Sequence, residues 1–284
     1  MELNTSNDLS RKIASLLFYL FMMNFAALFV LYALAHILYP GSHYPIDNIE
    51  SWPNEVRIHT SIAANFYIYA FLTLFFVTVL WPYYRKEWAI FKHNLSRNVR
   101  LGIGFYFVGI TAMAVVNAIL MALGINMDNS ENQEFITQAF RHYPLYVFSF
   151  TLMAPLIEET VFRGFIFEFF DRMNLTERTK TILFFVTSII LFGSIHITTE
   201  LIEHRDVLRA LVVGLPYFVI GASICTVYYL TKSLFAAVLT HFIQNFVSSI
   251  MMLLLILLES AGIEMVGIFH LLHILSHLRF SFIL

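Results

Sequence analysis

Residues 143–167 read YPLYVFSFTLMAPLIEETVFRGFIF, an apolar run whose only charged residues are Glu158, Glu159 and Arg163. At a rise of about 1.5 Å per residue, a helix of this length crosses the roughly 30 Å hydrocarbon core of a bilayer. Ionisable side chains are rare in such helices, because burying a charge in hydrocarbon is costly. The stretch therefore predicts a membrane-spanning helix that carries a polar site.

The composition of the whole chain agrees with a membrane protein. Of its 284 residues, 59% are hydrophobic and 13% are charged, whereas water-soluble domains have about half and about a quarter. The 17 Lys and Arg against 19 Asp and Glu give a net charge of -2, which leaves no basic surplus for nucleic acid. The single cysteine, Cys225, excludes an internal disulfide and a cysteine-based metal cluster.

Outward from residues 143–167, the sequence predicts an all-α polytopic membrane helix bundle of about eight transmembrane helices. We expect the chain to form a single integral membrane domain, residues 1–284, with a motif region at 143–251. The first apolar run is too long for a signal peptide, so we expect an uncleaved helix. The expected spans are Ile13–Tyr39, Ser61–Tyr83, Leu101–Leu123, Tyr143–Phe167, Thr181–Thr199, Ala210–Tyr229, Ser233–Leu258 and Met265–Phe280.

The basic residues predict an orientation with both termini in the cytoplasm, because cytoplasmic segments are enriched in Lys and Arg. The basic linker at residues 85–100 is expected to be a cytoplasmic loop that rests on the membrane surface. With this orientation, 12 of the 17 basic residues are cytoplasmic: Arg11, Lys12, Arg85, Lys86, Lys92, Arg97, Arg100, Arg172, Arg178, Lys180, Lys232 and Arg279.

Helical spacing gives the two glutamates different neighbours. Glu159 and Arg163 are four residues apart and share a helix face, so we expect an ion pair that lowers the cost of burying both. Glu158 is turned about 100° away from Glu159 and is left to meet a substrate. Pro155, about one turn earlier, indicates either a kink that opens room near the site or a simple packing kink.

Two further spans carry polar groups. The fifth holds Phe192-x-x-x-His196, and the seventh holds His241-x-x-x-Asn245. His241 and Asn245 are four residues apart and therefore share one helix face. A carboxylate in a cavity can act as general base for water, and imidazole or carboxamide N–H groups can stabilise an oxyanion. Glu158 with His196, and His241 with Asn245, would supply these groups for amide hydrolysis. A structural ion cluster between helices is the alternative interpretation.

These motifs resemble those of a known protein family. Glu158-Glu159-x-x-x-Arg163, Phe192-x-x-x-His196 and His241-x-x-x-Asn245, in this order on three apolar segments, are similar to the CAAX prenyl protease and bacteriocin-processing (Abi, type II CAAX endopeptidase-like) intramembrane proteases. The resemblance covers about residues 143–251, and it implies an intramembrane endopeptidase with a peptide or protein substrate at the bilayer. The oligomeric state is left open.

The resemblance also implies roles for these residues. Glu158 would activate water with the help of His196, and His241 and Asn245 would be oxyanion or ligand groups. Glu159 and Arg163 would be the supporting pair. No cofactor is required on this interpretation.

A catalytic zinc held by Glu158, His196 and His241 is the alternative to a metal-free site, since one carboxylate and two imidazoles are a known zinc ligand set. The absence of a His-Glu-x-x-His sequence favours the metal-free glutamate mechanism. His270, His273 and His277 share one face of the last expected helix, but no carboxylate lies on that face to complete a metal site. We interpret them as an interfacial or interhelical polar face.

The substrate class stays open at this stage. The resemblance implies CAAX processing, bacteriocin or pheromone maturation, or self-immunity against bacteriocins. A non-proteolytic membrane scaffold or immunity protein is the main alternative, while a transporter is disfavoured because no repeated halves are found. The chain ends Phe280-Ser281-Phe282-Ile283-Leu284 without an ER-retention signal, so we expect a bacterial plasma membrane.

Overall fold

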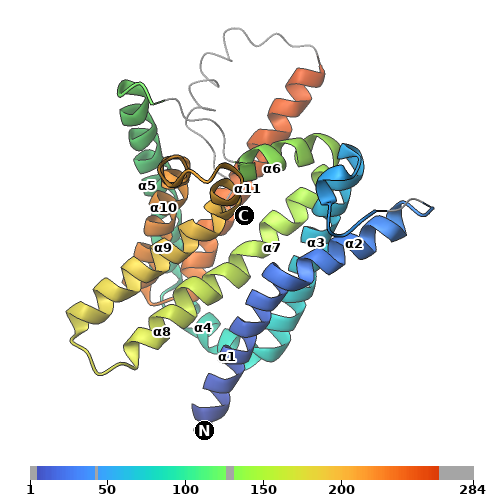
Figure 1. Cartoon of the computed structure of the whole chain (residues 1–284). Helices are drawn as coiled ribbons and strands as arrows, with labels where there is room; N and C mark the ends of the chain where they lie inside the picture. Colours follow the sequence, from blue (N-terminus) through green and yellow to red (C-terminus); the bar gives the residue numbers. More distant parts are fainter. Residues whose placement is uncertain (1–4, 42–43, 126–130, 262–284) are drawn as a thin grey trace.

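The computed structural model describes residues 5–41, 44–125 and 131–261, and within these residues every regular element is a helix (Figure 1). The N-terminal helical run consists of α1 (Thr5–Phe21), a π-helical segment (Met22–Ala26) and α2 (Ala27–Leu38), and a short 3-10 helix (Ile49–Ser51) follows. The remaining α-helices are α3 (Asn54–Val79), α4 (Trp81–His93), α5 (Leu95–Ala122), α6 (Glu131–His142), α7 (Pro144–Glu159), α8 (Ile166–Asp171), α9 (Glu177–His204), α10 (Val207–Thr231) and α11 (Leu234–Ser260).

The all-α fold class is confirmed, and six helices in the described part are long and apolar enough to cross a membrane. They are Asn54–Val79, Leu95–Ala122, Pro144–Asp171, Glu177–Thr198, Val207–Thr231 and Leu234–Ser260, which match the second to seventh expected spans. The first expected span coincides with the helical run from α1 to α2. The eighth, with His270, His273 and His277, lies outside the described residues. The protein is therefore an integral membrane protein.

Two expected loops contain helices instead. The basic linker begins within α4, which buries Tyr83, Tyr84, Glu87 and Phe91. Residues after the third span include α6, an amphipathic helix that packs on α7 and α9. Both helices are short, and neither was predicted because surface helices of this kind have no long apolar run.

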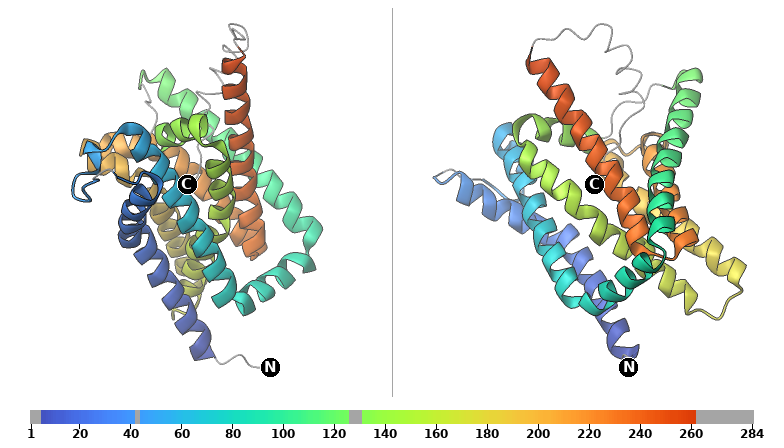
Figure 2. Two further views of the ribbon diagram at one scale, coloured as in Figure 1. Left: turned by 90° about the vertical axis from the view of Figure 1, so that its right-hand side faces the viewer. Right: turned by 180° about the vertical axis from the view of Figure 1, so that it is seen from behind.

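The helices pack so that α7 lies at the centre of the motif region. It lies between α3 and α11, while α10 packs mainly against α9 and α5 (Figure 2). A π-helical segment, Thr160–Phe165, joins α7 to α8 and also contacts α9 and α11. The central position of α7 brings its carboxylates next to α3, α11 and the π-helical segment.

The start of α1, α4 and the connection between α8 and α9 lie at one end of the bundle (Figure 1). At this end Lys12 of α1 forms an ion pair with Glu168 of α8, with Nζ 2.6 Å from Oε2. Glu87 of α4 accepts a hydrogen bond from the backbone N–H of Leu234 at the start of α11. The carboxylate thereby satisfies a donor that a helix N-terminus leaves without an intrahelical partner.

Candidate active site

Glu159 and Arg163 form the expected ion pair in the interior of the bundle. Arg163 Nη1 lies 3.0 Å from Glu159 Oε1, and both side chains are fully buried. Arg163 Nη2 donates a second hydrogen bond to the carbonyl of Gly221 in α10, over 2.9 Å. Its guanidinium group also lies over the ring of Phe192, 4.3 Å from the centroid. From the π-helical segment the arginine thus contacts α7, α9 and α10, while the supporting role implied for the pair stays a prediction.

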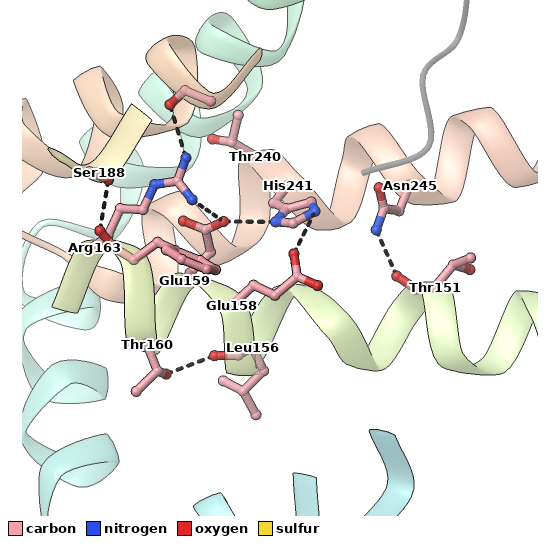
Figure 3. A network of polar contacts seen from close by, with 12 residues as sticks. Thr151, Leu156, Glu158, Glu159, Thr160, Arg163, Ser188, Thr240, His241 and Asn245 are labelled. Atoms are coloured by element: carbon pink, nitrogen blue, oxygen red, sulfur yellow. Dashed lines mark hydrogen bonds and ion pairs between the residues drawn. The ribbon is translucent and has the colours of Figure 1, made fainter. Parts of the chain in front are cut away.

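His241 of α11 contacts the pair of glutamates (Figure 3). Its Nδ1 lies 2.7 Å from Glu159 Oε1, and its Nε2 lies 4.0 Å from Glu158 Oε2. Because the carboxylate of Glu159 acts as the acceptor, the proton of the short bond is placed on Nδ1, and Nε2 of the neutral ring is left as an acceptor. The three side chains are fully buried. His241 is therefore oriented by one glutamate and directed at the other.

Glu158 is held from the opposite direction by Tyr69. The Tyr69 hydroxyl, in α3, donates to Glu158 Oε1 over 2.9 Å. The second oxygen, Oε2, has no hydrogen-bond partner among the described residues and faces His241. One oxygen of Glu158 is thus fixed, and the other is available to a small polar ligand. A distance of 4.0 Å is too long for a direct hydrogen bond.

His196 lies in an aromatic environment near the same cluster. Its ring stacks on Tyr217, with centroids 4.7 Å apart and an interplanar angle of 10°. The ring of Phe192 meets His196 at 4.9 Å and His241 at 5.8 Å, both edge to face. Phe192, the first residue of its motif, therefore contacts both histidines and the guanidinium of Arg163.

Asn245 lies one turn after His241 and points at α7. Its Nδ2 donates to the backbone carbonyl of Thr151 over 2.8 Å, and the Asn245 side chain is fully buried. The structure thus places Glu158, Glu159, His241 and Asn245 along the interface of α7 with α11, and Arg163 in the π-helical segment that follows α7. The sequence paired Glu158 with His196, but the carboxylate faces His241; the assignment of catalytic roles stays a prediction.

The residues named for zinc do not converge on one point. No group of three His, Cys, Asp or Glu side chains within the described part of the chain is arranged to hold a metal ion. His241 Nδ1 already bonds Glu159, and the described ring contacts of His196 are with Tyr217 and Phe192. As arranged here, Glu158, His196 and His241 do not fit a three-ligand zinc site.

Sequence reasoning missed Tyr69 and Thr151. Tyr69 precedes Glu158 by 89 residues and lies in an apolar segment with no motif, so no local spacing indicates their contact. Thr151 takes part through its backbone carbonyl, which no side-chain pattern reports. Pro155 is a sequence signal for the contact at Thr151. A proline inside a helix has no N–H, so the carbonyl four residues earlier, here that of Thr151, lacks its helical donor.

Comparisons with known proteins agree with the position of these motifs. Residues 140–247 match the family model described as type II CAAX prenyl endopeptidase Rce1-like. The chain is 28% identical over 144 residues to the membrane-embedded CAAX protease MroQ of Staphylococcus aureus (strain USA300). That alignment covers 50% of this chain and 53% of the relative, so the chain spans about half of the length of the protein that it matches.

No solved structure gives a significant match to this chain. The predicted site residues all lie inside the segment that the family model matches: Glu158, Glu159, Arg163, His196, His241 and Asn245. Tyr69, from α3, lies outside it. On its three motifs and on these two matches, the segment 140–247 of this chain is similar to the type II CAAX prenyl endopeptidases.

Proposed function

We propose that this protein is an intramembrane endopeptidase in which Glu158 activates a water molecule to hydrolyse a peptide bond at the membrane. The observation that carries the proposal is the 4.0 Å separation between Glu158 Oε2 and His241 Nε2. Two acceptors that face each other at this distance suit a water molecule that donates one proton to each. Such a water is oriented for attack on a carbonyl carbon.

Hydrolysis at Glu158 would proceed in two steps. The water oxygen adds to the peptide carbonyl while one of its protons passes to Glu158, and the carbonyl oxygen becomes an oxyanion. The C–N bond then breaks, and the proton on Glu158 passes to the leaving amine. Glu159, held by Arg163, keeps the His241 ring in position through Nδ1.

The oxyanion needs hydrogen-bond donors near the site. Asn245 supplies carboxamide N–H groups, and His196 supplies an imidazole N–H. Removing one such donor from a hydrolase typically costs about 10²- to 10³-fold in kcat. We therefore assign Glu158 as base, and His196, His241 and Asn245 as groups that hold the water or stabilise the oxyanion.

The substrate class proposed is a peptide or protein segment at the bilayer surface, as in CAAX processing. The name of the Staphylococcus aureus relative supports this class. Bacteriocin processing or self-immunity is the related option within the same family. The proposed location is a bacterial plasma membrane, and no cofactor is required.

The first test compares the wild type with Glu158→Gln. Glutamine has nearly the same shape but cannot take up a proton, so we expect cleavage of membrane-proximal peptides, followed by mass spectrometry, to fall at least 10²-fold. Equal thermal stability of the two proteins in detergent is the control for folding. Cleavage that persists in Glu158→Gln removes the assigned base. If neither protein cleaves any peptide, the result favours a non-proteolytic scaffold.

A second test addresses zinc. The wild type is assayed before and after exhaustive chelation, with the metal content measured in the same samples. We expect full activity in a preparation that contains no zinc. Activity that disappears with the metal and returns on adding zinc would instead support the arrangement in which Glu158, His196 and His241 rearrange around an ion.

A further inference from the structure

Pro155 changes the hydrogen bonding of α7 at one defined place. In an α-helix the N–H of a residue donates to the carbonyl four residues earlier, and proline has no N–H. Pro155 therefore deprives the carbonyl of Thr151 of its partner within the helix, and both residues lie inside α7. A buried carbonyl without a partner is costly in a membrane, so a donor from elsewhere is needed.

The donor comes from α11. Asn245 Nδ2 lies 2.8 Å from the Thr151 carbonyl oxygen, and the Thr151 and Asn245 side chains are fully buried. A carbonyl only accepts hydrogen bonds, so this contact fixes which end of the carboxamide faces α7. One turn further along α11, Ser249 Oγ lies 3.3 Å from Thr151 Oγ1. Two side chains of α11 thus converge on the residue whose backbone Pro155 has altered.

The same face of α11 carries His241, since residues 241, 245 and 249 are spaced four apart. The contact of Asn245 with Thr151 is therefore one turn from the contact of His241 with Glu158 and Glu159. A bond that fixes α11 against α7 at this level also fixes where His241 meets the two carboxylates.

We propose that Pro155 is a positioning residue of the site: by freeing the Thr151 carbonyl it anchors the Asn245 carboxamide and sets the register of α11 against α7. Its consequence for catalysis rests on the proposed function, whereas the anchoring itself does not. The role of Asn245 is then twofold, because the same amide that is offered to a substrate oxygen also closes the gap in the backbone of α7.

The test is a double-mutant cycle of Pro155→Ala and Asn245→Ala, with unfolding in mixed micelles as the readout. With Pro155 in place, Asn245→Ala leaves the Thr151 carbonyl without a partner, and we expect the unfolding equilibrium to shift by roughly tenfold or more. Alanine at position 155 restores the N–H that Thr151 lacks. In that background we expect Asn245→Ala to shift the equilibrium by less than about threefold.

Two matched controls are present in the chain. Pro216 is a second proline inside a helix, α10, and Pro216→Ala should leave the cost of Asn245→Ala unchanged. Asn98 is a second buried asparagine that donates to a backbone carbonyl, that of Phe91, over 2.9 Å. The cost of Asn98→Ala should be the same with Pro155 or with alanine. Equal costs of Asn245→Ala in both backgrounds would overturn the proposal.

A second measurement needs no proline variant, in case Pro155→Ala fails to fold. With threonine labelled at its carbonyl carbon with ¹³C, we expect the signal of Thr151 to move in Asn245→Ala and to stay in place in Asn98→Ala. An unmoved signal overturns the anchoring.

The cleavage assay separates this inference from the proposed function. We expect Pro155→Ala to lower kcat several-fold with little change in KM, and Pro216→Ala to change neither. An unchanged kcat in Pro155→Ala would reduce Pro155 to a packing residue. If the stability effects of Pro155→Ala and Asn245→Ala are coupled but the protein cleaves no peptide, the anchoring is supported. The absence of cleavage then counts only against the proposed protease function.

Discussion

The hydroxyl of Tyr69 in α3 donates a hydrogen bond to Glu158 in α7, and this bond leaves only one oxygen of the carboxylate facing His241. The contact joins the motif region to a helix that the family model does not include. Tyr69 stacks on Phe150 of α7 at a centroid distance of 6.2 Å, which limits the positions of its ring. The orientation of the Glu158 carboxylate is therefore set by α3 and α11 together.

Tyr69→Phe removes this bond and keeps the ring. We expect cleavage to fall about 10-fold or more because the carboxylate can rotate away from the water position, with stability lowered by about 1 kcal/mol. Steady-state kinetics with the same peptides measure the effect. Tyr106→Phe is the control, since Tyr106 of α5 is also buried and lies on another helix. Equal losses in both variants would contradict a specific role of Tyr69.

Arg163→Met breaks the buried ion pair and leaves the carboxylate of Glu159 without its cation. We expect a loss of stability of about 3–5 kcal/mol, because an uncompensated charge stays in the interior. Adding Glu159→Gln should recover part of this loss. The matched control is Arg172→Met, which breaks a partly exposed pair with Glu168 and should cost at most about 1 kcal/mol. Unfolding in detergent compares the variants, and a similar cost for both arginines would refute the interpretation.

Gly164→Ala tests the close approach of α4 to the π-helical segment. A Cβ at residue 164 would collide with the hydroxyl of Tyr83, while the ring carbon behind it lies 3.5 Å away. We expect a destabilisation of about 1–3 kcal/mol. Because the Tyr83 hydroxyl has no hydrogen-bond partner in the described structure, Tyr83→Phe should be tolerated and should restore the stability of Gly164→Ala. If the double variant is no more stable than Gly164→Ala, another contact causes the strain.

The buried carboxyl of Glu87 predicts a pH dependence of stability. Burial in α4 raises the pKa of Glu87 above its usual range, and the N–H of Leu234 opposes this shift only in part. Ionising the group is thus harder in the folded protein than in the unfolded chain. Its stabilising contribution is full below the unfolded pKa, about 4.3, and is lost as the pH rises through the folded pKa.

The measurement is the melting temperature of the wild type and of Glu87→Gln across this pH range. The wild type should lose stability relative to the variant as the pH rises, since glutamine keeps an acceptor for Leu234 and does not ionise. Parallel pH profiles of the two proteins would show that Glu87 titrates as it does in the unfolded chain.

The sequence was informative where the contacts are local. The spacing of Glu159 and Arg163 within one helix predicted their ion pair, and the long apolar runs predicted the spans that α3, α5 and α9 to α11 form. Both conclusions follow from the repeat of the α-helix and the thickness of the bilayer.

The partners of Glu158 could not be predicted in this way. Whether His241 or His196 faces the carboxylate depends on the rotation and depth of α9 and α11 relative to α7, and a change of one residue turns a helix face by about 100°. The contact with Tyr69 depends on the packing of α3, which has no polar motif. The single sequence holds no signal for these rotations.

The π-helical segment Thr160–Phe165 has a consequence for how the chain tolerates insertions and deletions. A π turn holds about one residue more than an α turn, so removing one residue here lets the segment close as an α turn with little rotation of the helix beyond it. After such a deletion Glu168 would still face Lys12, with which it pairs. A deletion in α8 ahead of Glu168 would instead turn that side chain by about 100° and break the pair. A one-residue change of length is therefore absorbed within Thr160–Phe165 and not in the regular helix that follows it.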